Sequence, residues 1–369
     1  MPADLIANVI AQGERLATHS WEYGTFSEAL LEWYNPESSV FGANPFPDGN
    51  VPVLHIEDVK SLAYAQPHIS TNGTTLIDGD GAAGDPASLG VSAILIGQVQ
   101  PEYLAAAGWQ VDHLLYDVPR WSNGAISHRE SVAELWADFV YMAPPTFAYW
   151  AVATGNETRL NEAMRQCLLY RDVLAVPSDA DDDAAGLWHH IIGPESQDLG
   201  IWSTGNGWAA AGMARVYATA KKSRFAPEGE TADNMGQLKD LIKRILDGAI
   251  ALDGAEPDES LLHNYLNDTS WFGELSGTTV LTATAYRMMQ LAPEEFRDDS
   301  KYAAWADRKR GEIISRIGNN GLLAPVINPL DWSDRTPASE SPEAQSFAVL
   351  MFAAYRDTHS GDMKGRATR

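Results

Sequence analysis

The sequence predicts an all-α protein in which helices pair into hairpins that close into a ring. Three observations support this prediction. Apolar residues recur at the spacing of an amphipathic helix in about twelve segments. Only short runs, such as VPVL and TTLI, could be strands. The chain has no strict short repeat of the kind that open solenoids show, which favours a closed ring over an open stack.

The predicted helices follow one another in order along the chain. The first covers residues 2–20, where apolar residues lie at positions 5, 6, 9 and 10 and again at Leu16. The other helical patterns lie near residues 25–34, 56–64, 87–99, 102–116, 129–154, 157–175, 206–221, 235–252, 276–291, 299–317 and 341–356. We expect them to pair into stacked hairpins and to form one catalytic domain over residues 1–369.

Long polar connections separate several of these helices. They lie near residues 65–85, 178–204, 256–275 and 319–341 and are rich in glycine and acidic residues. Loops of this length without regular structure are often functional. We therefore expect binding residues on these connections.

Three helical segments share a small polar beginning and an alanine-rich continuation. They are residues 205–218, 275–288 and 341–357. Small residues allow neighbouring helices to pack closely, and a polar residue before a helix can cap it. If the three segments align around a ring, their beginnings face one mouth. The sequence therefore predicts that the functional site lies at that mouth.

The composition excludes some classes of partner. The 26 Lys and Arg residues are outnumbered by 50 Asp and Glu residues, so the formal net charge is −24. Such a surface repels nucleic-acid phosphates and anionic lipid headgroups, and we expect neither partner. The sequence leaves the oligomeric state open. A single cysteine, Cys167, excludes an intrachain disulfide and is predicted to be a packed thiol.

The beginning of the chain indicates a cytoplasmic protein. The first twenty residues lack the basic and continuous apolar regions of a secretory signal. No run reaches the roughly 18 apolar residues that cross a membrane. We expect a cytoplasmic location, or secretion if a leader precedes the sequence as written.

Asp138 is the first candidate for catalysis. In the stretch WADFVYMAPP it lies at the edge of an apolar face, with Leu135 three residues before it and Met142 four after. Partial burial raises the pKa of a carboxyl group, which suits a general acid near neutral pH. A salt-bridged or solvent-facing acid is the alternative.

Asp85 is the second acidic candidate. It lies at a predicted helix start in GDPASLG, with Pro86 in the first helical position. As a helix N-cap it would stay ionised beside the helix dipole. One carboxyl group with a raised pKa and one that stays ionised would suit acid/base catalysis, whereas the alternative is a cap without catalytic function.

Histidines and tryptophans are the candidate substrate contacts. His189 and His190 lie in GLWHH, and His128 and Arg129 lie at the predicted entry to the Asp138 helix. Surface positions are the alternative for each. Five tryptophans in loop-like stretches could stack on sugar rings or pack in the core: Trp121, Trp202, Trp208, Trp271 and Trp332.

The sequence gives little support for a metal. It contains nine histidines but no HExxH motif and no pair of cysteines, so no zinc site is predicted. The acidic runs at residues 178–183 and 78–85 lack the full pattern of a calcium-binding loop and are more typical of solvated loops.

Four motifs taken together resemble a known family. They are ELWADFVYMAPPTFAYWAVATG (134–155), GLWHH (186–190), GNGW (205–208) and ELSGT (274–278), in that order. This ordered set resembles the unsaturated uronyl and rhamnogalacturonyl hydrolases, the six-hairpin glycosidases of families 105 and 88. The resemblance implies an (α/α)6 barrel that needs no cofactor and binds an acidic oligosaccharide.

The resemblance also implies site residues. The family's catalytic aspartate falls on Asp138 and its partner on Asp85, followed by Gly90 in D-x-x-x-x-G. Its substrate-binding histidine falls on His189, and a histidine near the catalytic helix corresponds best to His128. Further candidate contacts in or beside these motifs are Arg129, Trp202, Asn206, Trp208 and Ser276. Thr204 departs from the pattern, because the family often has arginine before GNGW, so recognition of the substrate carboxylate could differ.

The implied reaction is the removal of a terminal 4,5-unsaturated uronic acid from an oligosaccharide that a lyase has produced. Asp138 would protonate C4 of the enol ether, and water would add at C5. Two alternatives stay open at this point: an inverting hydrolase of a saturated acidic glycan, and a helical toroid that binds partners without catalysis. Pectin, glycosaminoglycan, ulvan and plant gums are all possible sources of the substrate.

Overall fold

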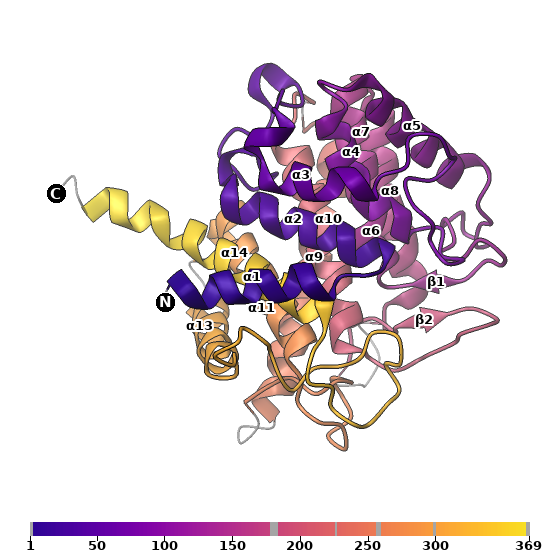
Figure 1. Ribbon diagram of the computed structural model, residues 1–369. Coiled ribbons are helices and arrows are strands. Elements are labelled where there is room, and N and C mark those ends of the chain that lie inside the picture. The colour runs from indigo at the N-terminus through magenta and orange to yellow at the C-terminus, as the bar shows by residue number, and fades with distance from the viewer. Residues whose placement is uncertain (1–2, 178–183, 226, 256–259, 298–299, 367–369) are drawn as a thin grey trace.

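The computed structural model describes residues 3–177, 184–225, 227–255, 260–297 and 300–366. Helices dominate this part of the chain (Figure 1). The α-helices are α1 (Ala3–Leu16), α2 (Ser20–Tyr34), α3 (Lys60–Ala65), α4 (Gly90–Ile96), α5 (Pro101–Tyr116), α6 (Phe139–Met142), α7 (Pro144–Thr154), α8 (Glu157–Leu174), α9 (Ser203–Lys222), α10 (Gly229–Ala255), α11 (Leu275–Leu291), α12 (Pro293–Phe296), α13 (Ser300–Ser315) and α14 (Pro342–Arg366). Strands β1 (Leu135–Trp136) and β2 (Ile191–Ile192) pair antiparallel.

Six hairpins form a closed double ring. Helices α2, α4, α7, α9, α11 and α14 make the inner ring, in which each helix packs on the next and α14 packs back on α2. Helices α1, α3, α5, α8, α10 and α13 form the outer layer, each against the inner helix of its hairpin or a neighbouring one. The fold is therefore an (α/α)6 barrel, and the all-α prediction is confirmed. At its C-terminal end, α14 extends beyond the rest of the body (Figure 1).

Glycines allow the inner helices to approach one another closely. A Cβ atom at Gly212 of α9 would lie 2.2 Å from the carbonyl oxygen of Val140. A Cβ atom at Gly277 of α11 would lie 2.2 Å from Oγ of Ser203, at the start of α9. Both distances are far below van der Waals contact, so a larger residue would push neighbouring helices apart. The small residues seen in the sequence therefore set the diameter of the ring.

The inner helices begin at the same mouth. Residues that precede or open the inner helices α2, α4, α9 and α14 line one cavity there, together with residues of the short helix α6 that leads into α7. Glu274, which caps α11 by accepting from the backbone N–H groups of Ser276 and Gly277, also accepts a hydrogen bond from Ser203 at the start of α9. The predicted convergence of the three alanine-rich helices on one mouth is confirmed.

The helix predicted over residues 129–154 is wrong in its first half. This segment instead contains β1, the short helix α6 and then α7. Pro144 and Pro145 open α7, where their missing N–H groups leave no helical bond unmade. Ahead of α6, the backbone bonds to distant partners, as where Ala137 N–H donates to the carbonyl oxygen of His190 at 2.9 Å. The possible strands VPVL and TTLI lie in irregular segments, and this prediction is also wrong.

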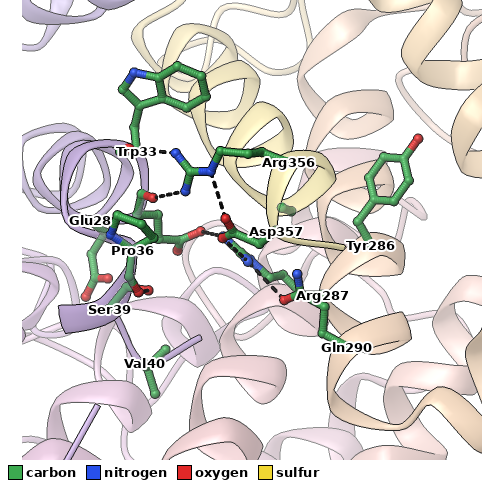
Figure 2. A network of polar contacts seen from close by, with 12 residues as sticks. Glu28, Trp33, Pro36, Ser39, Val40, Tyr286, Arg287, Gln290, Arg356 and Asp357 are labelled. Atoms are coloured by element: carbon green, nitrogen blue, oxygen red, sulfur yellow. Dashed lines mark hydrogen bonds and ion pairs between the residues drawn. The ribbon is translucent and has the colours of Figure 1, made fainter. Parts of the chain in front are cut away.

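Buried charges close the other end of the inner ring. Arg287 of α11 donates to Asp357 of α14 at 2.8 Å, and Arg356 donates to Asp357 and to the carbonyl oxygen of Trp33 (Figure 2). Arg215 of α9 pairs with Glu28 and Glu32 of α2. These residues lie at least two helical turns beyond the beginnings of their helices. We call Glu28, Glu32, Arg215, Arg287 and Asp357 the distal charge cluster.

Two smaller expectations can be compared with the structure. Cys167 is buried, and its thiol donates to the carbonyl oxygen of Ala163 at 3.4 Å, as expected for a packed thiol. Burial raises the pKa of this thiol. Among the described residues, no helix combines the length and the apolar character needed to cross a membrane.

Candidate active site

A cavity of about 170 Å³ opens at the mouth of the ring. Its walls contain four carboxyl groups, three histidines and four tryptophans. The lining residues are His19, Trp21, Gly79, Asp80, Ala82, Asp85, His128, Arg129, Trp136, Asp138, Met142, His190, Trp202, Pro329, Leu330, Trp332 and Glu343. Five of the nine predicted site residues therefore lie together: Asp85, Asp138, His128, Arg129 and Trp202.

Asp138 lies at the N-cap position of α6, not within a longer helix as predicted. The strand pair β1–β2 fixes the backbone just before it, because Trp136 pairs with Ile191. This pairing places His190 beside the carboxyl group. The Oδ2 atom of Asp138 lies 3.5 Å from Nε2 of His190 and is buried. An imidazole from another segment of the chain is thus a near neighbour of this oxygen.

His190 links Asp138 to a second carboxylate. Its Nδ1 atom lies 3.0 Å from Oδ2 of Asp198, which also accepts a hydrogen bond from the Tyr265 hydroxyl at 2.6 Å. Burial alone would lower the pKa of His190, but the hydrogen bonds and charges of Asp138 and Asp198 outweigh it and raise that pKa. Burial of Asp198 is outweighed in turn by its hydrogen bonds to His190, Tyr265 and Gly200, which lower its pKa to about 2. The arrangement favours an imidazolium held between two carboxylates.

Asp85 differs from the prediction. It is the first residue of a 3₁₀ turn, Asp85–Leu89, whose N-cap position is occupied by Gly84 and not by Asp85. Burial, and then the negative charge of Asp138, raise the pKa of Asp85 to about 8, although Arg129 acts in the opposite direction. The expectation of a capped and ionised Asp85 is therefore wrong. The protonated form of Asp85 is therefore favoured at neutral pH, because burial and the charge of Asp138 oppose its ionisation.

His128 stands beside Asp85 as a neutral ring. Its Nε2 atom lies 3.7 Å from Oδ1 of Asp85, and its ring stacks on Trp136 with the centroids 4.8 Å apart. Burial lowers the pKa of His128 to about 4, against the opposing charge of Asp138. At neutral pH the nitrogen near Asp85 belongs to an uncharged imidazole, which can accept or donate a hydrogen bond according to its tautomer.

Aromatic rings and one guanidinium complete the walls. Trp332 lies edge-on to both Trp136 and His190, with ring centroids 5.4 and 5.0 Å apart. The Cζ atom of Arg129 lies 5.9 Å from the Trp136 ring. Trp202 is fixed by a hydrogen bond from its indole nitrogen to Oδ1 of Asn264 at 2.9 Å. Flat apolar faces beside charged groups suit a sugar ring that carries a carboxylate.

The other four predicted contacts lie away from the cavity lining. His189 is half-buried, and its Nδ1 atom lies 2.7 Å from the carbonyl oxygen of Leu199. Trp208 is buried between Tyr141 and Phe347. In the GLWHH pair, the second histidine faces the cavity, because β2 begins directly after it.

Asn206 and Ser276 hold the backbone around the site. The Asn206 side chain accepts from the backbone N–H of Trp188 at 2.8 Å and donates to the carbonyl oxygens of Trp188 and Trp202. It therefore ties the segment before His190 to the first turn of α9. Ser276 is buried, and its N–H donates to Glu274. Thr204, which stands where arginine was expected, is buried and does not line the cavity.

Sequence reasoning missed several cavity residues. His19 and Trp21 flank the start of α2, and Glu343 lies in the first turn of α14. The polar beginning of the 341–357 segment did indicate that α14 opens at the mouth. Nothing in the sequence distinguished Glu343 from an ordinary acid in a first helical turn, because only neighbouring helices bury it.

The metal predictions concern two acidic runs. Residues 178–183 lie outside the described part of the chain. In the run at 78–85, Asp80 and Asp85 line the cavity. Within the described ranges, no group of three or more His, Cys, Asp or Glu side chains is arranged to hold a metal ion.

The comparisons with known proteins give one family and one fold. Residues 65–247 match the profile of Glycosyl Hydrolase Family 88. No curated protein matches the sequence. A possible member of the GH105 family from Klebsiella pneumoniae subsp. pneumoniae superposes with a TM-score of 0.73 at 18% identity, covering 96% of this chain and 92% of that one. A Family 105 glycoside hydrolase from C. acetobutylicum gives 0.70 at 15% identity, with 97% and 100% covered.

A third similar structure is of a UGL variant with dGlcA-Glc-Rha-Glc. It gives a TM-score of 0.61 at 13% identity and covers 91% of this chain and 85% of its own. At these identities the structural similarity establishes the shared barrel.

Proposed function

Because the match of residues 65–247 identifies this chain as a glycoside hydrolase of Family 88, we propose that it removes a terminal 4,5-unsaturated uronic acid from acidic oligosaccharides. The whole described ring serves this one reaction, since the inner helices together form the mouth. One observation supports the proposal above all others. Asp85, whose pKa is raised to about 8, shares a small aromatic cavity with Asp138 and with His190, whose pKa is also raised.

The substrate is an enol ether, whose ring oxygen enriches C4 in electrons. We assign Asp138 as the general acid and base that delivers a proton to C4. Asp85 and Asp138 form a coupled pair, since the charge of Asp138 contributes to the raised pKa of Asp85. The two carboxyl groups therefore share one proton, and Asp85 passes this proton to Asp138 for the reaction. Protonation leaves an oxocarbenium ion at C5 and the ring oxygen.

Water then completes the reaction. A water molecule adds to C5 and gives its proton to the Asp138 carboxylate, which returns the pair to its starting state. The product is a hemiketal at C5. The hemiketal opens to a C5 ketone as its ring oxygen becomes a hydroxyl on C1, and the C1 hemiacetal releases the next sugar as an alcohol. One water is consumed, and every proton is accounted for without a cofactor.

Positive charges in the cavity compensate the substrate carboxylate. Arg129 lines the cavity, and Asp138 and Asp198 raise the pKa of His190 and so favour its charged form. Neutral His128 contributes a hydrogen bond without a charge. The net charge of −24 opposes an anionic ligand at long range, but salt screens charges more than about 8–10 Å apart. Local charge at the site therefore governs binding of a short oligosaccharide.

An open groove continues from the cavity and suits the leaving sugars. It shares His19, Trp21 and Asp80 with the cavity and runs past Tyr23 and His68, whose rings stack 3.8 Å apart. One of the similar structures contains dGlcA-Glc-Rha-Glc, in which neutral sugars follow the first residue. Stacked rings and hydroxyl groups in the groove favour neutral sugars at these positions.

A panel of lyase-generated oligosaccharides from pectin, glycosaminoglycan, ulvan and plant gum tests the proposal. The ultraviolet absorbance of the double bond should decay with the wild-type protein on at least one class. Asp138→Asn should abolish the decay, whereas Asp117→Asn, which changes an exposed acid, should not. Release of sugar from a saturated oligosaccharide, without need for a lyase, would instead show an ordinary hydrolase. A folded protein that binds glycans but turns over none would be a binding toroid.

A further inference from the structure

Glu343 is a buried carboxyl group in the cavity, and the reaction above does not use it. It lies in the first turn of α14 and is 3% exposed. Its Oε1 atom accepts a hydrogen bond from Nε1 of Trp21 at 2.9 Å. Its Oε2 atom is buried and has no hydrogen-bond partner among the described residues. A buried polar atom without a partner is energetically unfavourable, so this oxygen is suited to bonding a ligand that enters the cavity.

The surroundings of Glu343 oppose a negative charge. Burial contributes most to a pKa well above the ordinary value, and the charges of Asp138 and Glu22 add to it. The hydrogen bond from Trp21 acts in the opposite direction, and Glu274 adds a smaller increase. The N-terminus of α14 also favours an anion, but it does not reverse the direction.

The cavity lining shows which other charged groups face Glu343. From the remaining elements of the wall come Asp80, Asp85, His19, His128, Arg129 and His190. Arg129 and His190 already have acidic neighbours in Asp85, Asp138 and Asp198. The raised pKa therefore favours the protonated form of Glu343, whose second oxygen then has a proton to donate.

We propose that Glu343 donates a hydrogen bond from Oε2 to the carboxylate of the uronic acid bound beside Asp138. The proposal rests on the proposed function for the identity of this sugar. A hydrogen bond from a neutral acid to a carboxylate is short and strong. It supplies a donor in a cavity where position 204 offers no arginine, since Thr204 lies outside the lining.

The proposal predicts a pH dependence of binding. Glu343 is a donor only while it is protonated, that is, below its raised pKa in the folded protein. As the pH rises through that pKa, the donor is lost and a second negative charge faces the substrate carboxylate. The KM for an unsaturated uronide should therefore rise on the alkaline side, beyond any change in kcat.

Calorimetric binding of glucuronate, compared with glucose, tests the contact without requiring catalysis. The wild-type protein should prefer glucuronate. Glu343→Ala should weaken glucuronate binding by about 10- to 100-fold, as expected for a lost hydrogen bond to a charged group, and should leave glucose binding nearly unchanged. Glu343→Gln should restore most of the preference, because its amide donates from the same place and still accepts from Trp21. Glu340→Gln, an exposed neighbour paired with Arg15, is the matched control.

The outcomes separate this proposal from the proposed function. Equal binding of glucuronate by wild type and Glu343→Ala, with both folded, overturns the Glu343 contact even if unsaturated uronides are turned over. A Glu343→Gln protein that behaves like Glu343→Ala overturns it too, since the donor is then not what matters. If glucuronate binding follows the predicted order but no unsaturated uronide is consumed, the contact stands and the reaction is wrong.

Discussion

The Nε2 atom of His190 lies 3.5 Å from Oδ2 of Asp138. The two residues are 52 positions apart in the sequence, and the pairing of β1 with β2 brings them together. On its other side, His190 contacts Asp198, 3.0 Å from Nδ1. Both carboxyl groups raise the pKa of His190 and favour a positive charge beside the proposed catalytic acid.

Asp198 acts through His190, so its role is one of positioning. Asp198→Asn should lower the pKa of His190, because it removes one of the two charges that raise it. The imidazolium beside Asp138 would then be lost at a lower pH, and kcat/KM should fall by about 10- to 100-fold at neutral pH. The titration of the His190 ring by NMR and the pH profile of kcat/KM check this. Tyr265→Phe, which keeps the Asp198 charge, should cause a smaller shift, and an unmoved His190 titration would contradict the prediction.

Asp85 should set the alkaline limit of activity. Its pKa is raised to about 8, so the pair with Asp138 holds its proton below that pH and loses it above. We expect kcat/KM to decline tenfold per pH unit above about pH 8. Asp85→Asn cannot pass on a proton and should lower kcat by about 100-fold or more, with no alkaline limb near pH 8. A wild-type profile that stays flat to pH 10 would disagree with this assignment.

Asp85 should also lower the unfolding free energy of the protein at neutral pH. For an acid with a raised pKa, the folded state binds more protons than the unfolded state between the ordinary pKa near 4 and about 8. Stability contributed at this site therefore falls as the pH rises through that window. Asp85→Asn removes the cost and should stabilise the protein by on the order of 3 kcal/mol at pH 7, and by less at pH 4. Urea unfolding at both pH values measures the difference, and Asp117→Asn serves as the exposed control.

Arg129 should contribute to binding of the substrate carboxylate. Arg129→Met keeps an unbranched side chain along Trp136 but removes the charge, and KM for an unsaturated uronide should rise by about 10-fold or more. Added salt should raise the wild-type KM and change the variant less. Arg165→Met, at an exposed residue paired with Glu162, should leave KM unaltered. Equal salt dependence in Arg129→Met and wild type would show that the charge does not face the substrate.

The distal charge cluster should stabilise the folded ring without taking part in catalysis. Arg215→Met leaves Glu28 buried without its partner and leaves Glu32 paired with Arg287 alone, which should lower the unfolding free energy by about 3–5 kcal/mol at neutral pH. Burial raises the pKa of Glu28, so the loss should shrink as the pH falls and Glu28 takes up a proton. Arg171→Met, at an exposed pair with Asp172, should change stability by less than about 1 kcal/mol. Unfolding in urea at pH 5 and pH 7.5 provides the comparison.

The sequence alone determined the ring, its mouth and the two aspartates. Helical periodicity is a local property, so the spacing of apolar residues revealed the hairpins, and the polar beginnings of the alanine-rich segments indicated where the inner helices open. The motif around Asp138 resembled a known family strongly enough to predict a catalytic role for this residue together with Asp85.

Only the tertiary structure decided how these groups are charged and which neighbours they meet. The pKa of Asp85 depends on burial by distant segments and on Asp138, so the local reading of a capped carboxylate was wrong. Which of His189 and His190 lines the cavity depends on where β2 begins. The burial of Glu343 depends on the packing of α14 against α2. Desolvation and charge–charge interaction act through space, and residues far apart in the chain come within their reach only when the ring has closed.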